Sequence, residues 1–141
     1  MQTMHSPPTT RLVAMTVLAL VVLGCRKNDK LPSLHDRIIA ANSSQYCHSP
    51  DACFNPSVLA VEDGYFVTTF QSNKFQHAHI PPKELARYLQ ELPMQAWPQG
   101  PSIIISPTDD VTDGKAVQQN FQLAQQLCRS LGLEVDVRLG G

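Results

Sequence analysis

Cysteine and histidine side chains are the groups in this sequence best suited to thiol or metal chemistry. Cys47 and Cys53 enclose the five residues HSPDA. In an oxidising compartment these two thiols are expected to form a disulfide, which for so small a loop would contribute only about 2 kcal/mol. A metal site built from Cys47, His48 and Cys53 is the alternative, although the spacing matches no common ligand pattern.

Two histidines and three aspartates are further candidate ligands. His77 and His79 alternate along a predicted strand, so both rings point to one side and could hold a metal. No third ligand is near them in the sequence, which favours a solvated edge strand. Asp109, Asp110 and Asp113 lack the alternating ligands and the distal glutamate of a calcium loop. Capping of the following helix is therefore favoured over cation binding.

The rest of the chain carries no recognisable catalytic motif. It has no serine in an elbow motif, no glycine-rich phosphate loop and no evident carboxylate pair. Cys128 falls on the apolar stripe of a predicted helix, where a thiol acts as a small hydrophobic group. The 11 Lys and Arg residues are scattered among 12 acidic ones, which argues against nucleic-acid binding. We expect no enzymatic activity, no cofactor and no resident metal.

An apolar run near the N-terminus gives the clearest functional signal. Residues 12–24 carry no charge, and Arg11 precedes them. The run is too short to span a bilayer, which needs about 20 apolar residues, but it suits a secretory signal. It ends in VLGC (residues 22–25), which resembles the bacterial lipobox, whose cysteine thiol carries the diacylglycerol. This pattern predicts a lipoprotein signal peptide over 1–24 and lipidation of Cys25, the alternatives being an ordinary cleaved signal or a buried helix.

Lipidation would also fix the compartment. Each buried methylene of an acyl chain contributes about 0.8 kcal/mol, so several chains on Cys25 would hold the protein on the membrane. The next residue is Arg26 and not Asp, which in lipoproteins favours the outer membrane where the host has two membranes. The expected location is the bacterial cell envelope, on the periplasmic side.

The chain after the signal divides into a tether and one domain. Residues 25–56, which include the small cysteine loop, are largely polar. A weak helical patch contains Leu34 and Ile38, and Ser33 could cap it, but we interpret the segment as a tether. Residues 57–141 are predicted to form the folded domain.

Hydrophobic periodicity gives the order of elements in this domain. Strands are predicted in SVLAVEDGYFVTTF (57–70, a hairpin around Asp63-Gly64), KFQHAHI (74–80), SIIIS (102–106, apolar on both faces) and LEVDVRL (133–139, with Leu133, Val135, Val137 and Leu139 inward). Helices are predicted where Leu85, Tyr88, Leu89 and Leu92 share a face, and where Val117, Phe121, Ala124, Cys128 and Leu131 form a stripe that Gly132 ends. The predicted fold class is α+β: two layers, a mixed β-sheet with two helices on one face, in the order β-β-(β)-α-β-α-β.

Trp97 and Met94 are the candidate partner-binding residues. They lie in a proline-rich loop between the first predicted helix and the strand at 102–106. An exposed tryptophan is a common anchor in interfaces, whereas a buried one would only cover the end of the sheet. The sequence leaves both interpretations open.

Residues 57–139 resemble the periplasmic domain of the ExbD/TolR family, small subunits of ion-driven envelope motors. The resemblance is carried by VLAVEDGYFV, KELARYLQEL, SIIIS, TDDVTDGKAV and the glycine before the last strand. That family is anchored by a membrane helix with an acidic residue, which residues 12–24 do not provide, so the motor function is not carried over. The resemblance implies a small periplasmic module that contacts the cell wall or envelope proteins as a dimer.

Together these observations predict a lipid-anchored, non-catalytic binding module. Its expected partners are the membrane, through the lipid, and an envelope protein or cell-wall component. The alternative is a small periplasmic metal- or thiol-handling protein that uses Cys47, His48, Cys53, His77 and His79.

Overall fold

The computed structural model describes residues 30–41, 47, 53–108 and 114–139. The predicted signal peptide over 1–24, Cys25, His48 and the aspartates at 109, 110 and 113 lie outside the described residues. From Pro32 onward the described residues belong to one compact unit. Among them, no helix combines the length and the apolar character that crossing a membrane requires.

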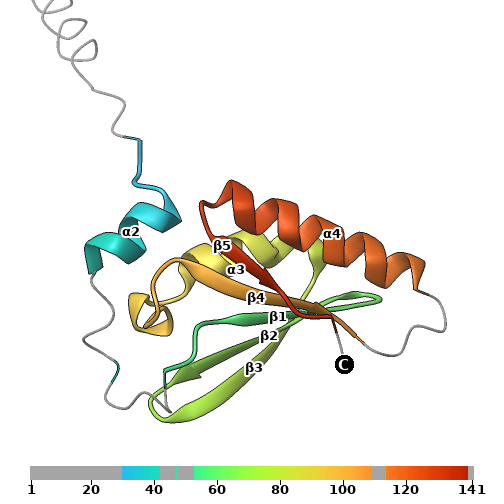
Figure 1. Ribbon diagram of the computed structural model, residues 1–141, viewed down its shortest axis with the longest axis horizontal. Coiled ribbons are helices and arrows are strands. Elements are labelled where there is room, and N and C mark those ends of the chain that lie inside the picture. The colour runs from blue at the N-terminus through green and yellow to red at the C-terminus, as the bar shows by residue number, and fades with distance from the viewer. Residues whose placement is uncertain (1–29, 42–46, 48–52, 109–113, 140–141) are drawn as a thin grey trace, which may run out of the picture. The chain divides into compact units, whose positions relative to one another are not determined.

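A five-stranded mixed sheet forms one layer (Figure 1). The strands are β1 (Ser57–Val61), β2 (Gly64–Gln71), β3 (Lys74–Ile80), β4 (Ser102–Pro107) and β5 (Glu134–Val137), in the spatial order β3-β2-β1-β4-β5. The pairs β1–β2 and β2–β3 are antiparallel, whereas β1–β4 and β4–β5 are parallel. The prediction of a mixed sheet is confirmed, and the third strand at 74–80 is formed.

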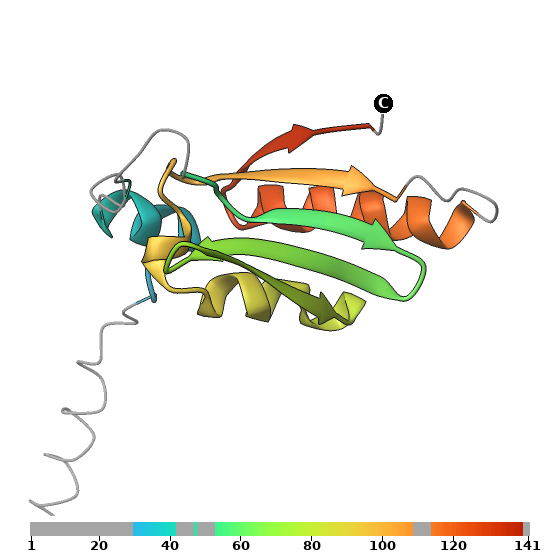
Figure 2. The same ribbon diagram turned by 90° about the horizontal axis from the view of Figure 1, so that it is seen from below.

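Helices cover one face of this sheet. They are α3 (Leu85–Glu91), which continues the 3-10 turn Pro82–Glu84, and α4 (Lys115–Ser130). Figure 2 shows the strands in front of both helices, so the two-layer arrangement and the α+β class are confirmed. A further 3-10 turn, Met94–Ala96, and a further helix, α2 (Leu34–Ala41), were not predicted as elements of the domain.

Helix α2 corrects the predicted tether. Its N-terminus is capped as expected, because the amide of Asp36 donates a hydrogen bond to Ser33 Oγ at 3.1 Å. Leu34 and Ile38 are buried in the same core as the sheet and the other helices. The interpretation of 25–56 as a tether is therefore wrong for the helix. Two apolar residues are a weak local signal, and their packing in the core stabilises a helix that would be marginal alone.

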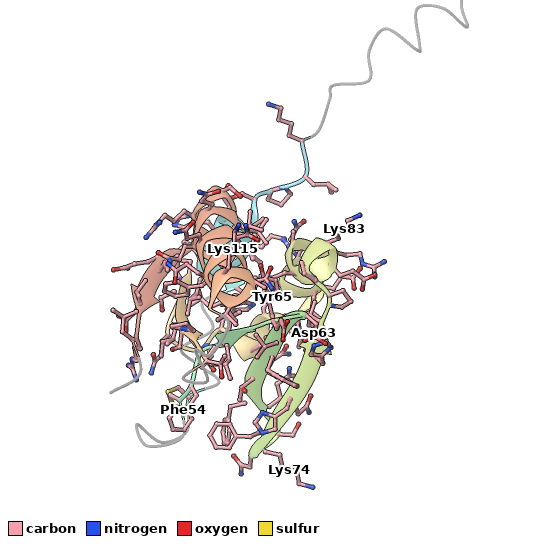
Figure 3. The ribbon with its side chains drawn as sticks, turned by 90° about the vertical axis from the view of Figure 1, so that its right-hand side faces the viewer. Phe54, Asp63, Tyr65, Lys74, Lys83 and Lys115 are labelled. Carbon is pink, nitrogen blue, oxygen red and sulfur yellow. A yellow bond between two sulfur atoms is a disulfide. The ribbon has the colours of Figure 1, made fainter. Side chains whose placement is uncertain are left out.

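Strand alternation places the core between the sheet and the helices. In β2, Tyr65, Val67 and Thr69 face the helices and are buried. Figure 3 shows Tyr65 on this side of the sheet, and its hydroxyl donates a hydrogen bond to the backbone carbonyl of Asn120 on α4 at 2.9 Å. The Asn120 side chain in turn donates to the carbonyls of Val61 and Glu62, at 2.8 and 3.1 Å. These bonds fix α4 on the β1–β2 turn.

The strands on the C-terminal side are covered on one face only. In β4, Ile103 and Ile105 are buried, whereas Ile104 faces the other side and is half-buried. No residue of β5 itself is buried, and the buried Leu133 lies just before it. Val137 is 37% exposed, and Leu139, beyond the strand's end, is 70% exposed. The prediction that all four apolar residues of this strand point into the core is therefore wrong. In an edge strand, apolar and polar residues can alternate over the whole length although the core covers only part of the strand.

Candidate binding face

The face of the sheet opposite to α3 and α4 carries several exposed apolar side chains, among them Leu59, Phe66 and Phe75. Period-2 alternation brings Leu59, Phe66, Phe70 and Phe75 to this side. The register pairs Leu59 with Phe66 across β1 and β2, and Phe70 with Phe75 across β2 and β3, with Thr68 between the two pairs. We call this side the open face. Apolar side chains gathered in this way commonly mark an interaction surface.

Three phenylalanines form a cluster at one end of the open face. The ring of Phe54, in the segment before β1, lies 5.6 Å from the ring of Phe70 and 5.4 Å from that of Phe75. Phe70 and Phe75 are 4.9 Å apart, nearly edge to face. Such contacts add about 0.5–1.5 kcal/mol per pair. Phe75 nevertheless remains 54% exposed, and Figure 3 shows Phe54 beyond the sheet, away from the helices.

The two histidines considered as candidate ligands, His77 and His79, lie on the open face of edge strand β3. His77 Nδ1 is 2.9 Å from the hydroxyl of Thr68, and His79 Nε2 is 3.1 Å from the Asp63 carboxylate. The ring of His79 also stacks edge to face on Phe66, at 5.0 Å. In the part of the chain that the structure describes, no three Cys, His, Asp or Glu residues come together as a metal site. The expectation of a solvated edge strand is confirmed, because β3 is at the edge of the sheet and both histidines are exposed. His77 and Thr68 lie between Phe66 and the Phe70–Phe75 pair.

A hollow of about 530 Å³ adjoins the phenylalanine cluster. Its floor is the outer side of β4 and β5, with Ile104 and Asp136 as register partners, and Phe54 forms one wall. Arg138 lies at its border, with Nε 3.4 Å from Asp136 Oδ2. The hollow therefore combines an apolar wall with one carboxylate and one guanidinium.

Side chain to backbone hydrogen bonds hold the wall of this hollow in place. Asn55 Nδ2 donates to the carbonyls of Gly100 and Ser102, at 2.9 and 2.7 Å. Asn55 Oδ1 accepts from the amide of Gln99 at 2.8 Å. The segment with Phe54 is thus fastened to the loop that precedes β4. A site fixed in this way loses little conformational entropy when it binds.

The candidate partner-binding residues from the sequence are not on this surface. Trp97 is completely buried, and Met94 is half-buried and packed against the core. The interpretation of Trp97 as an exposed anchor is therefore wrong, and the alternative, a core residue at the end of the sheet, describes it. Proline-rich loops are normally on the surface, but this one contains the 3-10 turn Met94–Ala96, and the indole of Trp97 directly after the turn packs in the core.

The cysteines of the described residues have two different roles. Cys47 and Cys53 are joined as a disulfide, with Cα atoms 5.5 Å apart. Their sulfurs are therefore not available to a metal while the bond is intact. Cys128 is buried on α4, and this burial raises the pKa of its thiol to about 12. A thiol with so high a pKa is a poor nucleophile at neutral pH.

Cys128 is accordingly expected to resist alkylation in the folded protein. At pH 8, on the order of one thiol in 10,000 would be ionised, so iodoacetamide should leave Cys128 unmodified until the chain is unfolded in about 6 M guanidinium. Because the pKa is raised on folding, this group's contribution to stability is complete below about pH 9 and is lost as the pH rises towards 12. Peptide mass mapping would measure the labelling. Equal labelling of folded and unfolded chains would contradict the burial.

Comparison with known proteins identifies no relative of this chain. No protein-family model, no curated protein and no solved structure matches this chain. The assignment of function therefore depends on the residues themselves.

The sequence predicts helices on one face of the sheet only, which leaves the other face to water or a partner, but the phenylalanines on that face were not singled out, although a signal was present. Phe66 and Phe70 alternate with Tyr65 and Val67 in one predicted strand, so that both sides of this strand carry apolar side chains. With helices available for only one side, one of the two apolar sets had to remain uncovered. The contribution of Phe54 could not be anticipated, because it depends on contacts with residues 16 and 21 positions later.

Proposed function

We propose that this protein is a lipid-anchored lipoprotein of the bacterial cell envelope, which uses the open face of its α+β domain to bind an envelope protein or a cell-wall component. The anchor is supported by the VLGC pattern at residues 22–25. The binding role is supported by one observation above all. The phenylalanines Phe54, Phe66 and Phe75 remain 43 to 54% exposed on a side of the sheet that the described helices leave uncovered.

Physical chemistry favours binding over catalysis for this face. Exposed aromatic side chains cost solubility, and they contribute large contact areas when a partner covers them. The polar groups around them are already paired, as in His77 with Thr68 and His79 with Asp63. Thr68 and His77 lie between Phe66 and the Phe70–Phe75 pair, so apolar and polar side chains alternate along this face. Interfaces commonly combine exposed aromatic side chains with polar groups of this kind.

A matched pair of substitutions tests the binding role. Phe75 and Leu123 are equally exposed, at 54 and 53%, but Phe75 lies on the open face and Leu123 on the outer side of α4. A photo-crosslinker would be placed at Thr68, on the open face. We expect Phe75→Ser to reduce crosslinking to envelope components by about tenfold, as for loss of an interface hot spot. Leu123→Ser should leave crosslinking unchanged. Equal effects of the two substitutions, or no crosslinked species at all, would refute a binding role for this face.

The anchor has a separate test. Replacement of Cys25 by serine removes the thiol that would carry the lipid, so we expect the variant to leave the membrane fraction, whereas the native chain stays there. Mass spectrometry of the native N-terminus should find Cys25 as the first residue, with acyl groups. A native chain that begins at Met1 and carries no acyl group would overturn the proposed location.

A further inference from the structure

We propose that the hollow beside Phe54 binds the head group of an α-amino acid, either free or on a peptide branch. Such a head group carries an ammonium and a carboxylate on the same carbon. This inference rests on the proposed binding role of the open face, and it names the ligand chemistry for one part of that face. It is based on the charges, the apolar walls and the size of the hollow.

The two charges of the hollow are complementary to this head group. Asp136 offers a carboxylate whose Oδ2 lies 3.4 Å from Arg138 Nε, and in the described part of the chain Oδ1 makes no hydrogen bond. Within the described residues, the two terminal nitrogens of the Arg138 guanidinium make no hydrogen bond. A guanidinium binds a carboxylate through two parallel N–H groups, and the carboxylate of Asp136 can accept from an ammonium. A compact zwitterion can contact both side chains at once because they are so close to each other.

Other classes of ligand fit these charges less well. A divalent cation prefers several oxygen ligands, whereas among the residues that the structure describes Asp136 is the only carboxylate lining the hollow, and Arg138 would repel the cation. An inorganic anion would be attracted by Arg138 and repelled by Asp136. A ligand that carries both a positive and a negative charge can be attracted by both side chains and need not be repelled by either.

The apolar walls can accept the ligand's side chain. Ile104 lies directly beside Asp136 in the β4–β5 register and is half-buried. The ring of Phe54 also lines the hollow and contacts the rings of Phe70 and Phe75. Ser102 adds a hydroxyl, which already accepts from Asn55 Nδ2 at 2.8 Å and can donate its own proton. A volume of about 530 Å³ exceeds that of one amino acid, so neighbouring units of a peptide can enter as well.

Calorimetry with leucine and two blocked derivatives tests the assignment. The full chain in detergent would be titrated with leucine, with N-acetylleucine, which lacks the ammonium, and with leucinamide, which lacks the carboxylate. We expect leucine to bind and each derivative to bind at least about tenfold more weakly, the fold-change of losing one charge-assisted hydrogen bond. Failure of leucine to bind at about 10 mM, or equal binding of all three compounds, would overturn the inference.

Variants in the hollow complete the test. Asp136→Asn and Arg138→Gln should each weaken leucine binding at least about tenfold. Glu134→Gln is the matched control, because Glu134 is an exposed acidic residue two positions before Asp136 on β5 and does not line the hollow. Its affinity for leucine should equal that of the native chain. Equal affinities of the Asp136 variant, the Arg138 variant and the native chain would overturn the inference.

Cosedimentation with purified cell wall separates the sources of the head group. Wall binding that both hollow variants weaken would identify wall peptides as the source, and leucine binding without wall binding would identify a free amino acid. Either result supports the head-group assignment. The outcome is also independent of the interface test. If Phe75→Ser abolishes crosslinking but the native chain does not bind leucine, the proposed function stands and only this inference fails.

Discussion

Replacement of Trp97 by alanine is expected to lower the free energy of unfolding by about 3–5 kcal/mol, the range for removal of a large buried aromatic side chain. Trp97 is the largest of the fully buried side chains and belongs to the central core cluster. A small domain has a total stability of about 5–15 kcal/mol, so this loss is large. Urea denaturation followed by circular dichroism would measure it.

Trp97→Phe is the informative companion variant. Within the described residues, the buried indole Nε1 makes no hydrogen bond. Phenylalanine loses some packing but also removes this uncompensated N–H group, so we expect a stability within about 1 kcal/mol of the native protein. Met94→Ala, at a half-buried position, should cost less than Trp97→Ala. If Trp97→Ala were as stable as the native chain, the position of the indole in the core would be wrong.

The second large effect is expected at Gly64, where the β1–β2 hairpin returns into β2. Gly64 has a φ of +152°, and a Cβ atom built on it would overlap the backbone carbonyl of Ile80 on β3. Alanine would therefore need both a rare backbone conformation and a displacement of the neighbouring strand. We expect Gly64→Ala to destabilise the protein by about 2–4 kcal/mol.

Gly100 provides the control for this prediction. Its φ is +83°, so alanine is also unfavourable there, but an added Cβ would meet no atom within 4 Å. Gly100→Ala should therefore cost only about 1 kcal/mol, the backbone contribution alone. The difference between the two variants, read from denaturation midpoints, isolates the contact with Ile80. Equal costs would show that this contact does not constrain the hairpin.

The sequence predicted correctly those elements whose own residues contain the signal, such as a turn dipeptide or an apolar stripe. Asp63-Gly64 predicted the first hairpin, and the apolar stripe from Val117 to Cys128 predicted the buried side of α4. The second hairpin was not singled out, although Ser72 and Asn73 form its turn with φ values of 52° and 59°. A polar residue can adopt the left-handed conformation, but no glycine marks the turn.

Features that depend on distant contacts could not be predicted in this way. Helix α2 is short, and Leu34 and Ile38 become significant only because the core accepts them. The local sequence around Trp97 is compatible with an exposed or a buried indole. Only the packing of the folded domain determines that the indole is buried. The hollow joins the segment at Phe54 to Asp136 and Arg138, more than 80 positions later, so its charges could not be grouped in advance.

The burial of Cys128 also bears on how the correct cysteine pair is formed. Thiol exchange proceeds through an attacking thiolate, and a buried thiol with a pKa of about 12 supplies almost none. Once α4 packs on the sheet, Cys128 is withdrawn from competition for Cys47 or Cys53. Folding of the helical layer before oxidation would thus select one pairing, and an oxidant that acts earlier would yield scrambled chains.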